Sequence, residues 1–394
     1  MSDLRFTIDR EAFTTAINWV ARTLPAKPIN PILGGIRISA DGDGLSLQAY
    51  DYEVSAAIKL SADVASQGET LVSGRLLAAI SRAFPKKPVE LSHEGPSVMI
   101  KCGTAEFTLP TMAVNDFPLL PAFPETLGTV DAEVFAEAAS QTIVAASRDE
   151  AVVQINCVCL EVTDAETLTL FATDKHRIAM RQLPWTPVSA DAILAGSKLL
   201  VPTRAIGEIG RMGGEEVGLS FTDNLLGIGG DERQTTTRLI AAGFPDCRRV
   251  IPNEHTSIAA VNATELAEAV NRAILLDERE FPRVRLEFST DALQLTGGKS
   301  GIGGIREELP VDFVGEPIAL WVNPKYLLDG LTALRADKAY IGFAGDRRPF
   351  VMTEHDGGGL AALGAGQPGP FSSLLTLDPN YVHLVMPTAG SDAR

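Results

Sequence analysis

The residues of this chain best suited to do chemistry are basic side chains at regular spacing. Arg75 and Arg82 lie seven residues apart, and Arg204 and Arg211 repeat that spacing. Seven residues make about two turns of an α-helix, so each pair is expected on one helix face. Guanidinium groups presented in this way can meet phosphate groups without contacting bases. For a single helix, an ordinary solvated face is the commoner explanation.

The recurrence of these bases favours a shared basic surface. Lys325 and Arg335 continue the pattern more loosely further along the chain. The chain is otherwise acidic, with 34 Lys and Arg against 50 Asp and Glu and a formal net charge of −16 at pH 7. Such an excess argues against a protein that grips nucleic acid with its whole surface. The sequence therefore predicts one basic surface, formed if the segments that carry these bases curve around a common axis.

The sequence lacks recognisable motifs for catalysis or metal binding. The segment Gly297-Gly298-Lys299-Ser300 resembles part of a phosphate-binding loop, but Leu293 stands where that loop needs its first Gly. A turn between two strands is expected there instead. The five histidines have no ligand spacing on one element. We therefore expect no catalytic residue, no metal and no cofactor.

A segment that recurs three times predicts the helices that carry the bases. Its copies start at Val72, Val201 and Val322, and each combines the end of an apolar strand, a turn and a helix with a base three residues after the Val. The copies lie about 125 residues apart, which exceeds the roughly 20–50 residues of a solenoid repeat and is the size of a domain. The sequence therefore predicts three copies of one domain.

A second recurring segment predicts another helix in each copy. Asp9, Asp131 and Asn262 each stand where a side chain can accept hydrogen bonds from the free N–H groups at a helix start. Alternating apolar residues predict antiparallel strands between the two helices, and a change of phase at Tyr50-Asp51 predicts a turn. Each copy is therefore expected to be an α+β domain with two helices packed on antiparallel sheets.

Proline clusters predict the boundaries between the copies. Phe117-Pro118 to Pro124 closes the first copy, and Phe244-Pro245 to Pro252 closes the second. The Gly-rich stretch at 357–370 has no counterpart in the other copies and is expected to be a flexible surface insertion. The expected domains are residues 1–125, 126–254 and 255–394.

Composition predicts a cytoplasmic protein that crosses no membrane. With 394 residues, 45% of them apolar and 21% charged, each copy can bury a core of its own. The sequence has no leader pattern and no apolar run of about 18 residues, so neither secretion nor membrane insertion is expected. Cys102, Cys157, Cys159 and Cys247 lack the paired spacing of a metal site and are expected to be buried thiols.

The second copy departs from the first at two places, which together predict a local binding site. It has Thr173 to Ile178 where the first copy has Tyr50 to Val54, and it has Asp246 to Ile251 after its Phe-Pro pair. An apolar floor of Ile, Val and Pro with a rim of Arg and His suits a short apolar peptide better than a small polar substrate. From these residues alone, ordinary drift among repeats explains the difference equally well.

At these segments the chain resembles the bacterial DNA polymerase III beta subunit, the replicative sliding clamp. The resemblance implies the DNA clamp fold, in which a head-to-tail homodimer closes six domains into a ring around duplex DNA. Loose, non-specific contacts inside such a ring would permit sliding, because the linkage to DNA is topological. Several segments in the same order carry the resemblance: Pro31 to Gly34, Phe107 to Pro110, Asp116 to Pro118, Ala172 to Ala179, Phe244 to Pro252 and Tyr381 to Pro387.

The resemblance also implies which residues bind DNA, partners and the second subunit. The DNA-facing positions would be Lys27, Arg75, Arg82, Arg148, Arg204 and Arg211. A peptide-binding pocket between the second and third domains would comprise Ile155, Thr173, Lys175, His176, Arg177, Ile178, Pro245, Arg249, Val250, Pro349, Leu384, Met386 and Pro387. The apolar members would take Leu or Phe anchors, while His176 and Arg177 would bond peptide carbonyls or a carboxylate. In the ring contact, Phe107 and Leu109 would meet Leu275 and Leu276 of another subunit.

The function implied by the resemblance is that of a non-catalytic processivity factor. Its partners would be double-stranded DNA, the alpha subunit of DNA polymerase III, other polymerases, the clamp loader, and mismatch-repair and ligase-type clamp-binding proteins. A clamp-like recruitment scaffold that is not loaded onto DNA is an alternative, and an enzyme built from three repeats is a more remote one.

Two departures from the family pattern suggest a specialised clamp. The family typically ends in Met-Pro, an apolar residue, Arg and Leu, whereas this chain continues from Met386-Pro387 through Thr388 to Arg394. The Gly-rich insertion precedes the strand that bears Met386. We therefore also consider a divergent or second-copy clamp, tuned to different partners or resistant to pocket-directed inhibitors.

Overall fold

The computed structural model describes most of the chain, and its residues form two compact units. Unit one comprises Met1–Glu133, Thr186–Ala192 and Glu208–Leu239, and unit two comprises Val134–Trp185, Ile193–Gly207 and Ile240–Arg394. The predicted division into three domains after residues 125 and 254 stays a prediction. The described residues are 4–42, 44–189, 196–209, 212–222, 224–230, 232–252, 254–277, 279, 282–299, 303–354, 371–372 and 381–389.

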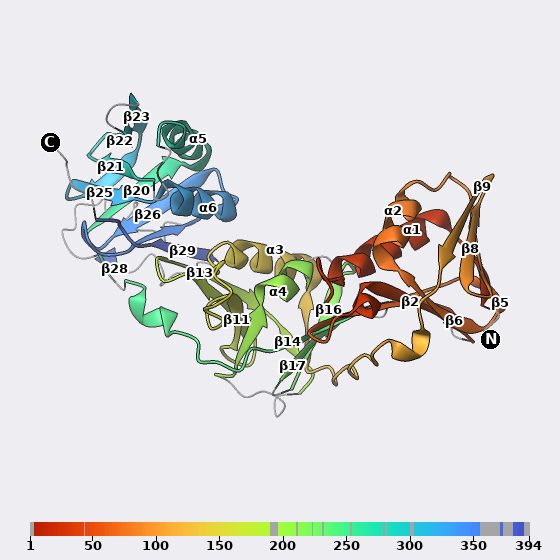
Figure 1. Cartoon of the computed structure of the whole chain (residues 1–394). Helices are drawn as coiled ribbons and strands as arrows, with labels where there is room; N and C mark the ends of the chain where they lie inside the picture. The colour runs from red at the N-terminus through yellow and green to blue at the C-terminus, as the bar shows by residue number, and fades with distance from the viewer. Residues whose placement is uncertain are drawn as a thin grey trace. The chain divides into compact units, whose positions relative to one another are not determined.

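Two helices of unit one lie side by side, α1 (Arg10–Val20) and α2 (Gly74–Arg82) (Figure 1). The predicted cap of α1 is confirmed, because Asp9 Oδ1 accepts hydrogen bonds from Glu11 N at 2.9 Å and Ala12 N at 3.0 Å. The helix turns Phe13 into the core, where its ring makes an edge-to-face contact with that of Phe6, with ring centres 5.8 Å apart.

Two antiparallel sheets make up the rest of unit one. In one of them, β18 pairs with β4, and the hydroxyls of Ser55 and Thr236 share a buried hydrogen bond at 2.6 Å. Segments from the first and second predicted copies therefore share one sheet. The five-stranded sheet has the order β5 (Asp63–Ser66), β1 (Arg5–Ile8), β7 (Val89–Glu94), β8 (Ser97–Cys102) and β9 (Ala105–Pro110). The nine-stranded sheet has the order β14 (Thr186–Pro187), β10 (Gly128–Asp131), β16 (Glu216–Phe221), β17 (Leu225–Gly229), β18 (Arg233–Arg238), β4 (Val54–Leu60), β3 (Gly44–Tyr50), β2 (Gly35–Asp41) and β6 (Gly68–Ser73).

Unit two has a second nine-stranded antiparallel sheet and a smaller four-stranded one. In the larger sheet, β13 of the second predicted copy pairs with β29, the last strand of the chain. Its order is β15 (Lys198–Pro202), β11 (Cys157–Val162), β12 (Thr167–Thr173), β13 (Arg177–Pro184), β29 (Tyr381–Val385), β27 (Phe350–Thr353), β26 (Lys338–Phe343), β20 (Ser257–Asn262) and β24 (Asp312–Gly315). The smaller sheet has the order β23 (Gly303–Pro310), β22 (Ala292–Lys299), β21 (Val284–Phe288) and β25 (Ile318–Val322), and β19 (Glu254–His255) pairs with β28 (Phe371–Ser372).

The helices of unit two follow the predicted repeat. They are most of α3 (Ala132–Ile143) and α4 (Thr203–Ile209), together with α5 (Ala263–Ile274) and α6 (Pro324–Leu334). Asn262 caps α5 by accepting a hydrogen bond from Glu265 N at 2.9 Å, as predicted. Helices and antiparallel sheets alternate along the whole chain, so the predicted α+β class is confirmed.

A buried polar cluster ties two helices of unit two to the last strand. Gln141 Nε2 on α3 donates to Ala333 O on α6 at 2.7 Å, and Tyr381 Oη donates to Gln141 O at 3.1 Å. The Tyr381 hydroxyl also lies 3.0 Å from His383 Nδ1. Burial lowers the pKa of His383 to about 3, so its ring is neutral near pH 7.

One of the two predicted turns between strands is confirmed, and the other differs in position. The phase change at Tyr50-Asp51 is the turn between β3 and β4, where Asp51 Oδ1 accepts from the main-chain N of Glu53 and of Val54. The turn predicted at Gly297 to Ser300 is not found at its first three residues, because Gly297 to Lys299 lie in β22, whose last pair with β23 joins Lys299 to Gly303. Ser300 lies outside the described residues. A phosphate-binding loop requires a strand followed by a helix, whereas β22 is followed by the strand β23.

Two helices end earlier than the sequence pattern predicts, since the apolar spacing of Phe13, Ile17, Val20 and Leu24 predicts a first helix that reaches Leu24. Helix α1 ends at Val20, and Leu24 follows a 3₁₀ turn at Ala21–Thr23. Helix α6 ends at Leu334, and Arg335 caps it in the left-handed conformation with φ 52°. Arg335 therefore does not share a helix face with Lys325, because its backbone leaves the helix.

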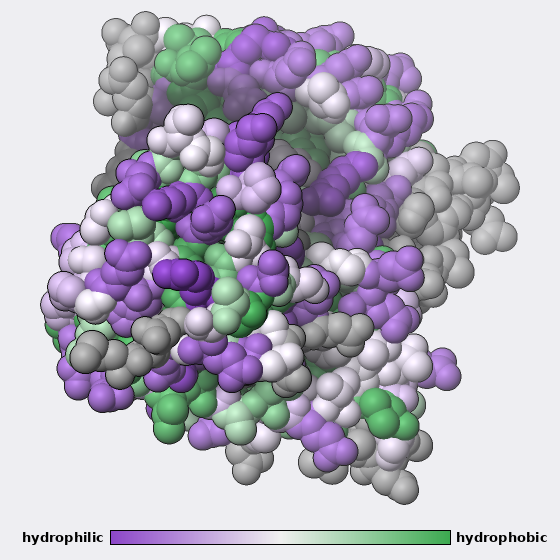
Figure 2. Space-filling view, turned by 90° about the vertical axis from the view of Figure 1, so that its right-hand side faces the viewer, coloured by the Kyte–Doolittle hydropathy of each residue, from purple (hydrophilic) through white to green (hydrophobic). Residues whose placement is uncertain are grey.

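No described helix is both long and apolar enough to cross a membrane. On the face drawn in Figure 2, hydrophilic residues predominate and hydrophobic residues occur in small groups between them. The 357–370 insertion lies outside the described residues, as does most of the chain end after Pro387.

Candidate partner pocket and DNA-facing residues

The turn between β12 and β13 positions the first wall of a pocket in unit two. Asp174 Oδ1 accepts from His176 N at 3.0 Å and from Arg177 N at 3.1 Å, and Thr173 Oγ1 donates to Arg177 O at 2.7 Å. Lys175 adopts a positive φ of 79°. The corresponding turn of the first copy has the same aspartate contacts and a positive φ of 75° at Tyr52. The two copies therefore differ there in side chains and share a backbone conformation.

Strand pairing brings β29 and Met386 next to this turn. Ile178 lies opposite Leu384 in the β13–β29 ladder, and Met386 N donates to His176 O at 2.8 Å. The segment after Phe244 closes the third side, through the 3₁₀ turn at Cys247–Val250. The resulting cavity of about 150 Å³ is lined by Thr173, Lys175, Arg177, Ile178, Pro245, Asp246, Cys247, Val250, Leu384 and Met386.

Most of the residues implied by the resemblance gather in this partner pocket, and some do not. Arg249 lies with 85% of its side chain exposed and pairs with Asp246 at 2.8 Å. Ile155 is buried, and the His176 ring stacks on Tyr326 at 6.2 Å. The predicted residues that do not line the cavity are Ile155, His176, Arg249, Pro349 and Pro387.

Sequence reasoning missed two lining residues, Asp246 and Cys247. Both lie in the segment after Phe244 where the second copy diverges from the first, so this divergence could have predicted them as lining residues. Cys247 belongs to a buried cluster with Cys157 and Cys159. Burial raises the pKa of all three thiols to about 12, so they are neutral and unreactive at physiological pH. All four cysteines of the chain are free and buried, as predicted.

Arg177 is the charged centre of the site and is 5% exposed. Its Nε donates to Asp174 Oδ2 at 2.9 Å, and its Nη1 donates to Asp329 Oδ2 on α6. The guanidinium carbon lies 4.5 Å from the centre of the Tyr326 ring, within the range of a cation–π contact. A buried guanidinium needs such partners, because an unpaired charge in a protein interior is costly.

Arg177 also borders a second cavity of about 340 Å³, which is lined by Ala146, Ser147, Arg148, Asp174, Arg177, Lys325, Tyr326 and Asp329. Two bases singled out in the sequence, Arg148 and Lys325, therefore lie at one site although they are far apart along the chain. Both side chains are exposed.

The remaining bases that the sequence singled out take several positions. In unit one, Arg75 donates to Pro25 O at 2.8 Å and Ala26 O at 2.5 Å, which holds the loop of the exposed Lys27. Arg82 Nε donates to Asn18 Oδ1 at 2.8 Å. In unit two, Arg204 is exposed in the first turn of α4. Arg211 lies outside the described residues.

The four expected ring-contact residues differ in exposure. Leu275 is 78% exposed, Leu276 is half-buried, and Phe107 is partly exposed with its ring 5.9 Å from Phe84. Leu109 is 1% exposed, because on β9 it faces the interior of unit one. Leu109 therefore offers little surface of its own in a single chain, and its assignment to the ring contact stays a prediction.

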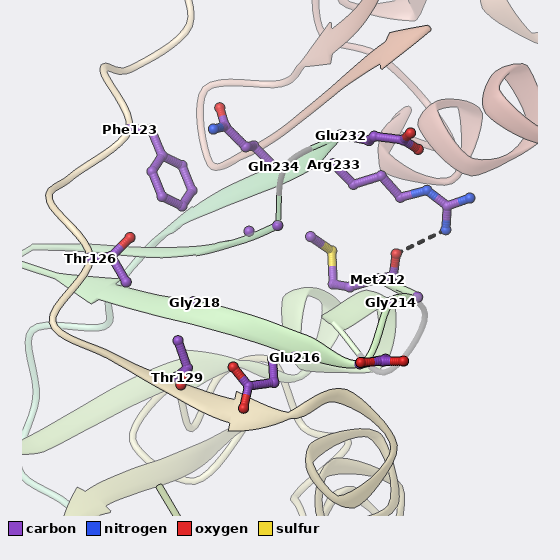
Figure 3. Close-up of a pocket in the computed structure, with 14 residues that line it drawn as sticks. Phe123, Thr126, Thr129, Met212, Gly214, Glu216, Gly218, Glu232, Arg233 and Gln234 are labelled. Carbon is purple, nitrogen blue, oxygen red and sulfur yellow. Dashed lines mark hydrogen bonds between the residues drawn. The ribbon is translucent and has the colours of Figure 1, made fainter. Parts of the chain in front are cut away.

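Unit one has a larger open groove of about 1010 Å³ (Figure 3), which is lined by none of the predicted site residues that the structure describes. A Cβ at Gly229 would lie 2.9 Å from the Phe123 ring, so the glycine lets this ring approach the sheet. Arg233 Nη1 donates to Met212 O at 2.9 Å across one end. The carboxylates of Glu215, Glu216 and Glu232 outnumber the single guanidinium of Arg233, so the lining has a net negative charge.

The repeated α+β segments, together with the pocket formed by segments far apart in the sequence, define a clamp-type protein. The DNA polymerase III beta subunit family is matched by its N-terminal domain at residues 4–121, its central domain at 129–246 and its C-terminal domain at 248–363. The chain belongs to this family, the bacterial sliding clamps.

Relatives and solved structures agree with this assignment. The beta sliding clamp of Streptomyces coelicolor is 36% identical over 357 residues, which cover 89% of this chain and 94% of the relative. The beta sliding clamp homolog GriR of Streptomyces muensis is 36% identical over 353 residues, covering 89% and 93% of the two chains. The structure of a Pseudomonas aeruginosa sliding clamp bound to griselimycin has a TM-score of 0.86 at 25% identity and covers 98% of this chain and 100% of that one. A Bacillus subtilis sliding clamp, at 22% identity, has the same fold with a TM-score of 0.86, covering 99% of this chain and 100% of that one.

Proposed function

We propose that this sliding clamp acts as a processivity factor: a head-to-tail dimer encircles duplex DNA and holds polymerases on it through the partner pocket. The pairing of Ile178 with Leu384 across β13 and β29 carries the proposal. It supports an apolar cavity with a charged rim, which suits the Leu or Phe anchors of a short peptide. In this proposal the protein is non-catalytic and works in the cytoplasm.

Exposed bases support the DNA-facing role. Arg75 and Arg82 on α2, Arg204 on α4 and Lys325 on α6 are all exposed on helices of the repeated segment. Side chains of this kind contact phosphates without reading bases, and their binding weakens with salt. A loose contact suffices when a closed ring prevents escape.

DNA retention tests this role. We expect the triple variant Arg75→Glu, Arg82→Glu and Arg204→Glu to lose retention on nicked circular DNA and stimulation of polymerase. A charge-matched triple variant on exposed strand or strand-end positions, Lys59→Glu, Lys101→Glu and Lys338→Glu, should keep both activities. Unchanged retention in the first variant would contradict the DNA-facing assignment. A wild-type protein that is never retained on DNA would instead favour a recruitment scaffold that is not loaded onto DNA.

Exposed apolar side chains support a subunit contact. Leu275 at the end of α5 is 78% exposed, so it is accessible to another subunit, and it is one of the positions that the resemblance implies for the ring contact. We expect Leu275→Asp to shift the protein from dimer to monomer at micromolar concentration in sedimentation experiments. Leu119→Asp alters a leucine that is 84% exposed in unit one and should leave the dimer intact. A wild-type protein that is monomeric at this concentration would contradict the ring.

The proposed partners are the alpha subunit of DNA polymerase III, other polymerases, the clamp loader, and mismatch-repair and ligase-type clamp-binding proteins. A cavity of about 150 Å³ has room for one set of apolar anchors, so these partners should compete. Displacement of a labelled polymerase-type peptide by each partner would measure that competition. Simultaneous binding of two partners to one subunit would exclude a single shared pocket.

A second candidate function is that of a specialised clamp with an altered pocket. Beyond Pro387, Thr388 N donates to Trp321 O at 2.7 Å, and Ala389 O accepts from Arg283 Nη1 at 2.5 Å. These contacts direct Thr388 and Ala389 toward Trp321 and Arg283, and neither residue lines the pocket. A relative is named as a clamp homolog, and a related clamp binds griselimycin, so weakened binding of such an inhibitor is part of this candidate function. Ordinary affinity for both a polymerase-type peptide and griselimycin would remove the case for it.

A further inference from the structure

The partner pocket has a charge balance that depends on a residue outside it. Lys175 and Arg177 bring two positive charges to its lining. Asp174 and Asp329, which each pair with Arg177, bring two negative charges. Asp246 lines the pocket as well, and its charge is met by Arg249 at 2.8 Å. Together these six groups, three that line the pocket and three that pair with them or lie beside it, sum to zero net charge.

We propose that Asp329 sets the charge preference of the partner pocket. Because Asp329 neutralises Arg177, a carboxylate beside the apolar anchors of a docked peptide does not increase the affinity of that peptide. This inference rests on the proposed function of the pocket as a peptide-binding site. In this inference the charge of Arg177 is neutralised by its partners, so Arg177 does not bind an anionic group of the peptide.

The geometry explains why Asp329 acts through Arg177. Asp329 borders the second cavity and does not line the partner pocket. It reaches the Nη1 atom of Arg177, while Asp174 takes the Nε atom. Tyr326, one helical turn earlier on α6, lies under the guanidinium plane at 4.5 Å. A single helix therefore supplies both the ring that supports Arg177 and the carboxylate that cancels its charge.

Of the two carboxylates that pair with Arg177, Asp329 is the one that can be replaced without disturbing the turn, because it is the more exposed. The Asp329 side chain is 38% exposed, whereas Asp174 is 14% exposed and also holds the turn through its main-chain contacts. Removing the charge of Asp329 leaves Arg177 with its ion pair to Asp174 and with the Tyr326 ring. The pocket then gains one net positive charge without losing the turn that forms its wall.

Two labelled peptides test the inference when their affinities are measured by fluorescence anisotropy on the full-length protein. They share adjacent Leu and Phe anchors and differ at one neighbouring position, Asp in one and Asn in the other. On the wild-type protein, the Asp peptide should bind no better than the Asn peptide. On Asp329→Asn, the ratio of the two affinities should shift by about five-fold toward the Asp peptide, as for two partly screened charges about 6–8 Å apart.

Matched variants separate charge from structure. Asp329→Glu keeps the charge and should keep the wild-type ratio, and Asp337→Asn removes an exposed carboxylate beyond the far end of the same helix and should also keep it. Both peptides are measured on one preparation, so a partly unfolded variant loses affinity for both and its ratio stays interpretable. The shift should shrink as salt is raised.

Two results would overturn the inference in distinguishable ways. An affinity ratio in Asp329→Asn equal to that of the wild type, or a wild-type preference for the Asp peptide, would show that Asp329 does not set the charge preference. Failure of both peptides to bind the wild-type protein would instead remove the proposed pocket itself, and the inference with it.

Discussion

Gln141 on α3 donates a hydrogen bond from its side chain to the main-chain oxygen of Ala333 on α6, at 2.7 Å and entirely out of contact with solvent. The two residues are 192 positions apart in the chain. The same glutamine accepts from the Tyr381 hydroxyl through its main-chain oxygen. One residue therefore joins helices from the second and third predicted copies to β29, the last described strand along the chain.

Replacing this glutamine should destabilise unit two. Gln141→Leu leaves Ala333 O without its donor in the interior, and we expect the free energy of unfolding to fall by about 1–3 kcal/mol. Urea unfolding followed by circular dichroism would measure the change. The exposed Gln154 provides a control, since Gln154→Leu removes an amide that is already in solvent. Equal stabilities of the two variants would show that the buried hydrogen bond contributes nothing.

Gly330 on α6 lies against the same cluster and should not tolerate a methyl group. A Cβ there would come within 2.3 Å of Met352 Cε and 2.5 Å of His383 Cδ2. Because the core has to shift to admit the methyl group, Gly330→Ala should cost about 1–3 kcal/mol of stability despite its better helix propensity. Gly243→Ala meets nothing within 4 Å and should be nearly neutral. Thermal unfolding of both variants would distinguish these outcomes.

Acid should destabilise the protein through His255. Burial lowers the pKa of His255 from 6.5 to about 4, so between these values the unfolded chain binds a proton that the folded chain does not. Stability therefore falls as pH decreases through this window, by about 1.4 kcal/mol per pH unit for one such group. His255→Phe should reduce that slope in urea-unfolding experiments run from pH 7 to pH 4. An unchanged slope would mean that other groups account for the acid sensitivity.

The thiols around the partner pocket should resist alkylation in the folded protein. Because burial raises the pKa of Cys157, Cys159 and Cys247 to about 12, very little thiolate is present at pH 8. Iodoacetamide should therefore modify these residues far more slowly than a free cysteine, as measured by mass spectrometry of intact protein. Unfolding in urea should make all four cysteines reactive. Rapid native labelling of Cys247 would indicate that the pocket opens to solvent.

Local features of the fold could be predicted from the sequence because they depend on neighbouring residues. Asp9 and Asn262 cap helices through N–H groups two or three residues away. The turn at Asp174 depends on contacts of the same short range, and alternating apolar residues predict the strands around it. The repeat of such features along the chain was sufficient to predict α+β copies and the general place of a partner site.

Long-range pairing could not be predicted in the same way. The sequence marks Arg177 as a member of the site, yet its pairing with Asp329, 152 residues away, follows from the packing of α6 against β29, the strand that pairs with β13. Leu109 matches the family pattern for a subunit contact, but on β9 its side chain is buried within its own unit. In both cases the environment of a side chain is set by strands and helices that its sequence neighbours do not specify.

The amino-acid sequence alone therefore identified the repeated domains, the helix caps and the basic helix positions, since hydrogen bonds and apolar periodicity act over a few residues. The tertiary structure decided which charges remain free, because only packing brings Asp329 to the guanidinium of Arg177 and leaves Lys175 exposed. Charge neutralisation acts through space over a few ångströms, whereas the residues involved are separated along the chain by more than a domain's length.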